Sequence, residues 1–164
     1  MTEQTKKLVR IAGKLKELVV IKDDKGNVLH KILNPVMVEF YSRDMMQIIV
    51  GAALLAIPIA FTEEVWNLGL TLPLGNVLLI SLLSLIFISS FVYYNFYRNR
   101  MKGQLFQFFK RVSAIYLGSF VVVALFLTLI NRAPWQLDLL LAVKRCILVA
   151  FPASMSAAVS DMIK

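Results

Sequence analysis

Carboxylates beside apolar runs are the side chains with the clearest chemical potential in this 164-residue chain. Glu63 and Glu64 directly follow the first apolar run, and Asp161 lies near the end of the last one. Rings of carboxylates at the ends of a membrane path concentrate cations. The three residues therefore predict the two mouths of a cation path. The alternatives for the glutamates are a solvated outer loop or a surface pairing with Lys144 and Arg145. The alternatives for Asp161 are solvation or pairing with Lys164.

Two stripes of small and polar residues could line such a path, because helical spacing places each stripe on one face. Their members are Gln47, Gly51, Pro58 and Thr62 in the first run, and Ala150, Ser154, Ala157 and Asp161 in the last. Small residues also let helices approach closely, and serine hydroxyls hydrogen-bond across such contacts. Tight helix packing is therefore the alternative to a water-lined path.

Two adjacent cations, Lys144 and Arg145, precede the last apolar run. A charge at mid-bilayer costs about 2.5–3.5 kcal/mol, so we expect both at the outer membrane face. A shift of 69 residues pairs Trp66 with Trp135 and lays Asn67–Asn76 over Gln136–Arg145. This possible internal repeat predicts that Gln136–Arg145 is an outer loop or an interfacial half-helix.

Enzyme signatures are missing from the sequence. It contains no glycine-rich phosphate loop, His-Glu-x-x-His, Gly-x-Ser-x-Gly or Cys-x-x-Cys. The single cysteine, Cys146, excludes an intramolecular disulfide, and the single histidine, His30, cannot build a metal site alone. We expect no catalytic residue, no cofactor and no bound metal.

Composition indicates a lipid environment for the elements that position these residues. Hydrophobic residues make up 59% of the chain and charged residues 17%, with a mean hydropathy of +0.72. Four apolar runs of 17–20 residues each match a bilayer core of about 30 Å, at Met45–Phe61, Val77–Phe96, Val112–Ile130 and Cys146–Ile163. We predict an all-α membrane protein with four transmembrane helices arranged as two helical hairpins.

Charge placement predicts the orientation. Residues 1–43 carry nine Lys or Arg against five acids, and Arg98–Arg111 carries five Lys or Arg and no acid, whereas Thr62–Asn76 is acidic. Basic flanks stay on the cytoplasmic side. We therefore expect a multi-pass protein of the cytoplasmic membrane with both termini cytoplasmic. Its basic face should contact anionic lipid rather than nucleic acid.

The N-terminal segment, residues 1–43, reads as a small cytoplasmic unit ahead of a transmembrane domain at residues 44–164. Leu8, Ile11, Leu15 and Leu18 recur at the spacing of an amphipathic helix. Leu18–Ile21 and Val28–Leu33 flank turn residues at 23–27 and read as a β-hairpin that Pro35 ends.

Several polar landmarks resemble a known family. They are the runs Asn34–Tyr41, Ala56–Pro58 with Phe61–Trp66, and Ala150–Ser154. With them, the chain from about Val28 onward resembles a prokaryotic family described only as integral membrane proteins, of unknown function. The resemblance implies a prokaryotic membrane and supplies no functional residue.

Taken together, these patterns favour a homo-oligomeric, cation-favouring ion channel with the carboxylates at its ends, because four short helices are too few to enclose a polar path easily within one subunit. The alternative is a non-conducting membrane scaffold or accessory subunit that docks a partner through the hairpin. A small secondary transporter built from two hairpin repeats is a weaker third possibility, because no predicted helix holds a charged pair deep in the bilayer.

Overall fold

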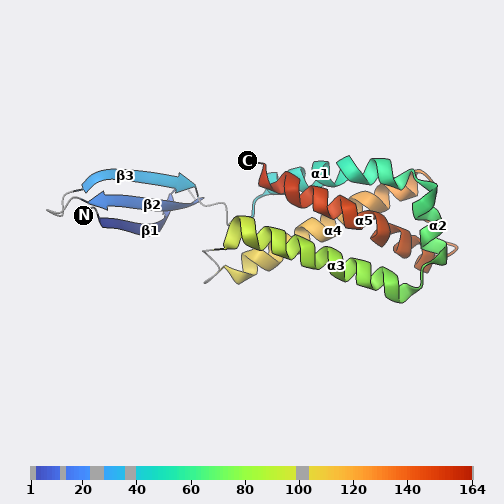
Figure 1. Ribbon diagram of the computed structural model, residues 1–164. Helices are drawn as coiled ribbons and strands as arrows, with labels where there is room; N and C mark the ends of the chain where they lie inside the picture. Colours follow the sequence, from blue (N-terminus) through green and yellow to red (C-terminus); the bar gives the residue numbers. More distant parts are fainter. Residues whose placement is uncertain (1–2, 12–13, 23–27, 36–39, 99–103, 164) are drawn as a thin grey trace. The chain divides into compact units, whose positions relative to one another are not determined.

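The computed structural model describes residues 3–11, 14–22, 28–35, 40–98 and 104–163 (Figure 1). The chain divides into two compact units, Met1–Glu39 and Phe40–Lys164. Each unit has its own secondary structure, β in the first and α in the second.

The first unit is an antiparallel sheet of three strands in the order β1-β2-β3. The strands are β1 (Glu3–Ile11), β2 (Lys14–Lys22) and β3 (Val28–Pro35). The predicted hairpin is confirmed by the β2–β3 register, in which Leu18 lies opposite Leu33 and Ile21 opposite His30. Its turn at residues 23–27 lies outside the described residues.

The predicted N-terminal amphipathic helix is wrong. Leu8 and Ile11 belong to β1, and Leu15 and Leu18 belong to β2. Short apolar segments can match helical and strand spacing at once. Here β-branched residues such as Val9, Val19 and Val20 favour strands.

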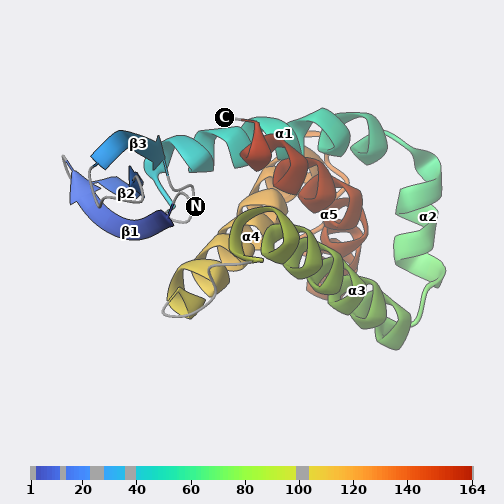
Figure 2. The same cartoon turned by 60° about the vertical axis from the view of Figure 1, so that its left-hand side comes forward.

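Among its described residues, the second unit contains four helices long and apolar enough to cross a membrane, which confirms the predicted number of spans. They are α1 (Ser42–Ala60), α3 (Leu74–Val92) continued by the π-helical turn η1 (Tyr93–Tyr97), α4 (Leu105–Leu129) and α5 (Leu139–Met162). Figure 2 shows these helices from a second direction. Each helix extends past its predicted apolar run at one or both ends, and in α1, α4 and α5 the added residues include charged ones.

The connections differ from prediction in three places. The segment Thr62–Asn76, predicted as an outer loop, contains the short helix α2 (Glu63–Thr71). Helix α4 already begins at Leu105, so Arg111 lies in a helix rather than in a loop. Helix α5 begins at Leu139 after its N-cap Asp138, so Lys144 and Arg145 belong to the long helix and not to a separate half-helix.

The proposed 69-residue repeat fails at the outer end. Helix α2 has no counterpart in the corresponding stretch, where α4 closes with Asn131 at φ 56° and irregular backbone follows. Asn131 N–H donates to Thr128 O (3.0 Å), and Arg132 N–H donates to Leu127 O (2.8 Å). This pair of bonds is the Schellman ending, which asparagine tolerates in place of glycine.

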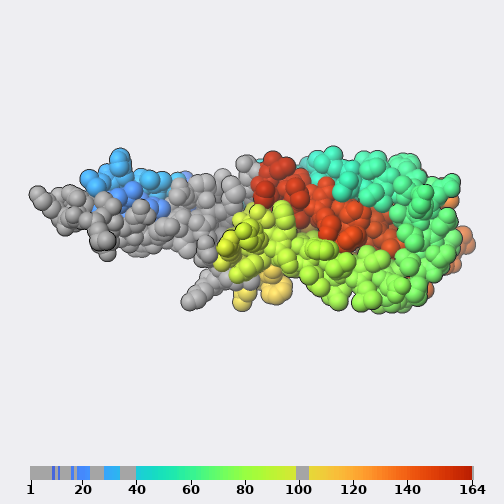
Figure 3. Space-filling view, in the orientation of Figure 1, coloured from blue at the N-terminus to red at the C-terminus, as the bar shows by residue number. Residues whose placement is uncertain are grey.

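Helix α5 lies at the centre of the bundle and packs against α1, α3 and α4. In Figure 3 it runs, in red, between α1 and α3. A Cβ added at Gly51 of α1 would lie 2.9 Å from Ala157 Cα and closer still to Ser160 Cβ. The small residues of α5 therefore permit a close helix crossing within the chain.

Candidate functional site

Three charged side chains from three spanning helices form a buried cluster. Arg111 Nη1 of α4 lies 3.0 Å from Asp161 Oδ2 of α5, and Arg111 Nη2 lies 3.4 Å from Asp44 Oδ2 of α1. The exposed fractions of Asp44, Arg111 and Asp161 are 1%, 0% and 0%. We call Asp44, Arg111 and Asp161 the charge cluster.

The two carboxylates lie at helix ends, whereas Arg111 lies inside α4. Asp44 lies in the first turn of α1, where its Oδ2 accepts a hydrogen bond from Tyr41 N–H (3.0 Å) and where the helix dipole favours a negative charge. Asp161 lies in the last turn of α5, where the dipole disfavours it. The bond that Arg111 Nη1 donates to Asp161 offsets this cost.

Aromatic rings enclose the guanidinium of Arg111. Its Cζ lies 4.0 Å from the ring centroid of Phe96 and 5.7 Å from that of Phe40. Tyr97 is fully buried beside Arg111 and meets Phe108 edge to face at 5.5 Å. The π-helical turn η1 makes this wall possible, because it leaves the consecutive residues Phe96 and Tyr97 both buried.

The charge cluster carries a net charge of −1 when all three groups are ionised, since two carboxylates face one guanidinium. In a low-dielectric interior such a cluster is stable only while its charges stay paired. Through these ion pairs the charge cluster can hold α1, α4 and α5 together. No group of three or more potential metal-ligating side chains occurs in the part of the chain that the structure describes.

Several predicted path residues make helix contacts within the chain. Ser154 is fully buried, and its Oγ lies 2.8 Å from Ser84 Oγ of α3. Ala157 is fully buried at the crossing with Gly51. The side-chain amide of Gln47 donates to Ile163 O. Asp161 is buried against Arg111 rather than solvated, and Lys164 lies outside the described residues.

The end of the bundle opposite the charge cluster holds a second buried arginine. Arg145 is 8% exposed and donates to Trp66 O from Nε (3.3 Å) and Nη2 (3.2 Å), and to Arg132 O from Nη1 (2.8 Å). A Cβ at Gly69 would lie 2.6 Å from Arg145 Cγ, so α2 sits directly on this side chain. Arg132 in turn stacks on Trp66 at 3.7 Å. Arg145 thus ties α2 and the α4–α5 connection to α5.

The remaining outer residues are more open. Glu63 and Glu64 are exposed in the first turn of α2, where the helix dipole favours negative charge, and Lys144 is half-buried. Thr62 precedes them, and its hydroxyl donates to Ile59 O (2.8 Å). Among the described residues, no ion pair joins Glu63 or Glu64 to Lys144 or Arg145.

Sequence reasoning missed Asp44 and Arg111 as site residues. Asp44 directly precedes the first apolar run, Arg111 directly precedes the third, and Asp161 falls near the end of the fourth. With alternating spans, all three positions fall at the same membrane face. Opposite charges at one membrane face were the sequence feature that could have indicated this cluster.

The spanning helices and the interfacial helix α2 define a four-span α-helical membrane protein. Residues 17–163 match the family described as "Putative integral membrane protein (DUF2391)", and the chain belongs to this family. No curated protein and no solved structure matches the chain.

Proposed function

We propose that this membrane protein is not an enzyme and forms, as a homo-oligomer in a prokaryotic cytoplasmic membrane, a cation-favouring ion path. We further propose that the charge cluster controls the inner end of the path. The observation that carries the proposal is a fully buried arginine held between two buried carboxylates from different spanning helices.

The buried charges support this proposal, because burying an ion pair adds little to the folding stability of a protein. Well-packed apolar side chains of similar volume often stabilise a protein as well as a buried ion pair does. Ionisable residues within membrane spans are instead typical of ion pathways and proton relays. Loss of the negative charge of Asp161 or Asp44 would weaken the hold on Arg111, and Arg111 could then leave the position that it fills.

The described conformation corresponds, in this proposal, to a closed path. Ser154, Ala157 and Asp161 are fully buried, so none of them is reached by water from either side. The small residues of α5 are also engaged within the chain at Gly51. Subunits would therefore associate through other faces of the bundle.

Orientation follows from the basic flanks, which favour a cytoplasmic location for both termini and for the basic segment before α4. The charge cluster then lies at the inner end, beside a basic face that would contact anionic lipid. Glu63 and Glu64 lie at the outer mouth. In a Cys146→Ser background, Asn67→Cys should react with an impermeant reagent from outside, and Arg43→Cys only after permeabilisation. Reversed labelling would contradict this orientation.

Ion flux into liposomes tests the proposed path. The purified oligomer should pass potassium faster than chloride. Replacing both Glu63 and Glu64 by Gln should lower that flux at low salt and less so at high salt, because salt screens exposed charges over about 8–10 Å. Asp138→Asn, at the same end and still able to cap α5, is the matched control. Wild-type flux equal to that of protein-free liposomes at several pH values and voltages would contradict conduction.

A scaffold role is the second candidate, and strand β3 favours it. Val28, Leu29, Ile32 and Leu33 are each about half exposed on this edge strand of the sheet. Edge strands with apolar side chains can accept a further strand from a partner. A scaffold predicts no flux in the wild type. It also predicts that a cross-linking group at position 29 forms a defined cross-link to a partner protein in cells. Ile32→Lys should abolish this cross-link.

A further inference from the structure

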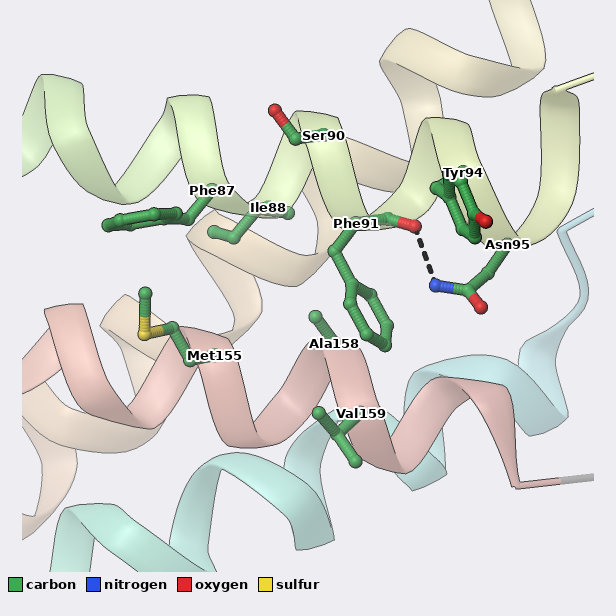
Figure 4. Close-up of a pocket in the computed structure, with 9 residues that line it drawn as sticks. All are labelled: Phe87, Ile88, Ser90, Phe91, Tyr94, Asn95, Met155, Ala158 and Val159. Atoms are coloured by element: carbon green, nitrogen blue, oxygen red, sulfur yellow. Dashed lines mark hydrogen bonds between the residues drawn. The ribbon is translucent and has the colours of Figure 1, made fainter.

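A groove between α3 and α5 lies near the charge cluster. It has a volume of about 690 Å³ and is lined largely by apolar side chains, among them Phe87, Phe91, Met155 and Val159. Figure 4 shows the side chains of α3 and α5 that line it. This volume lies within the range of about 300–1,000 Å³ that is usual for ligand sites.

Polar groups gather at one end of the groove. Tyr94 and Asn95 of η1 line this end, and Asn95 Nδ2 donates to Phe91 O at 2.8 Å (Figure 4). The exposed Arg98 lies next to them. Its Nη1 donates to the Tyr94 hydroxyl at 2.9 Å, and its Cζ lies 4.8 Å from the Tyr94 ring centroid.

Arg98 directly follows the apolar span Leu74–Tyr97, so it lies at the membrane interface rather than within the hydrocarbon. Within the described residues, no carboxylate forms an ion pair with Arg98. Its guanidinium can therefore bind an anion at the depth where lipid phosphates lie. Arginine suits phosphate, because its planar fork can donate two parallel hydrogen bonds.

We propose that this groove binds an anionic phospholipid of the adjacent leaflet, with one acyl chain between α3 and α5 and the phosphate on Arg98. An apolar groove gains dispersion contacts when a chain fills it and offers water few partners. The guanidinium of Arg98 at the interfacial end selects an anionic head group over a neutral amphiphile. The site does not depend on ion conduction.

Native mass spectrometry of the detergent-purified full chain measures this site directly. The probes are palmitoyl-oleoyl phosphatidylglycerol and the phosphatidylcholine with the same acyl chains. The wild type should bind the anionic lipid about tenfold more tightly, as expected for hydrogen bonds to a charged group. Arg98→Gln should abolish that preference, whereas Lys110→Gln, an exposed cation near the same end of the bundle, should retain it.

Filling the groove separates the acyl-chain contact from the charge. Val159→Trp should weaken binding of both lipids, and Met155→Trp provides a second filled variant in case the first does not fold. Leu140→Trp, exposed on α5 outside the groove, should bind as the wild type does. Equal binding of the two lipids by the wild type would overturn the proposal. Three other results would overturn it too. They are undiminished lipid binding by both filled variants, displacement of the lipid by inorganic phosphate, and closure of the groove by a second copy of the chain.

Discussion

Two buried arginines at opposite ends of one bundle are held in different ways. Arg111 is paired with the carboxylates of Asp44 and Asp161, whereas Arg145 is held by the backbone carbonyls of Trp66 and Arg132. A carboxylate carries a formal negative charge, whereas a backbone carbonyl is neutral. The Arg111 site is therefore an ion-pair cluster, and the Arg145 site is a neutral structural tie.

Removal of each guanidinium is the strongest test of this contrast. Arg111→Met leaves two buried carboxylates without their cation and should destabilise the bundle by about 3–5 kcal/mol. Arg145→Met leaves carbonyls short of a donor, which costs about 1–3 kcal/mol. Thermal unfolding in detergent, followed by circular dichroism, measures both effects.

A rescue experiment sharpens the comparison. Adding Asp44→Asn and Asp161→Asn to Arg111→Met removes the unpaired charges and should restore most of the lost stability. Asp138→Asn, the nearest matched change at the Arg145 end of the bundle, should not rescue Arg145→Met. Equal losses for both arginines, or no rescue of Arg111→Met, would show that the two sites do not differ in kind.

Contact between α2 and Arg145 gives the next largest effect. Gly69→Ala places a Cβ 2.6 Å from Arg145 Cγ and should cost about 1–3 kcal/mol through overpacking. Gly75→Ala, with no atom within 4 Å of the added Cβ, is the control and should stabilise α3 by about 0.4–1 kcal/mol. The same unfolding assay measures both variants. Tolerance of Gly69→Ala would place α2 away from Arg145.

Replacing the aromatic rings that contact Arg111 and Arg132 should change the unfolding free energy by smaller amounts. Phe96→Leu removes the ring that lies 4.0 Å from the buried Arg111 and should cost about 2 kcal/mol. Trp66→Leu removes the ring beneath the exposed Arg132 and should cost about 0.5–1 kcal/mol from the lost cation–π contact. Unfolding midpoints measured in low and high salt distinguish the two contacts. Salt should weaken the exposed Arg132–Trp66 contact, and should leave the buried Arg111–Phe96 contact largely unchanged.

The number of spans could be predicted from the sequence because runs of 17–20 apolar residues have few alternatives in water. The first and last residues of the spanning helices could not be predicted in this way. Arg111 and Arg145 lower the local hydropathy, yet both remain helical because partners from distant segments satisfy their charges or donors. The sheet shows the converse error, because Leu8 and Leu15 fit a helical period while their neighbours favour strands.

The charge cluster was only partly predictable. Asp161 drew attention as a lone acid near the end of a span, but its partner lies 50 residues away on another helix. Which cation meets which acid depends on how α1, α4 and α5 pack. That packing is set by small residues such as Gly51 and Ala157, whose spacing alone is compatible with either a helix crossing or a pore lining.

Cation flux into liposomes at fixed pH, for the wild type and Asp161→Asn, tests most directly whether the charge cluster controls an ion path. Asp161 accepts a hydrogen bond from Arg111, which also pairs with Asp44. Removing the negative charge of Asp161 weakens the hold on Arg111, so Asp161→Asn should conduct more than the wild type, with the oligomer intact. Flux that is identical in both proteins would contradict this role.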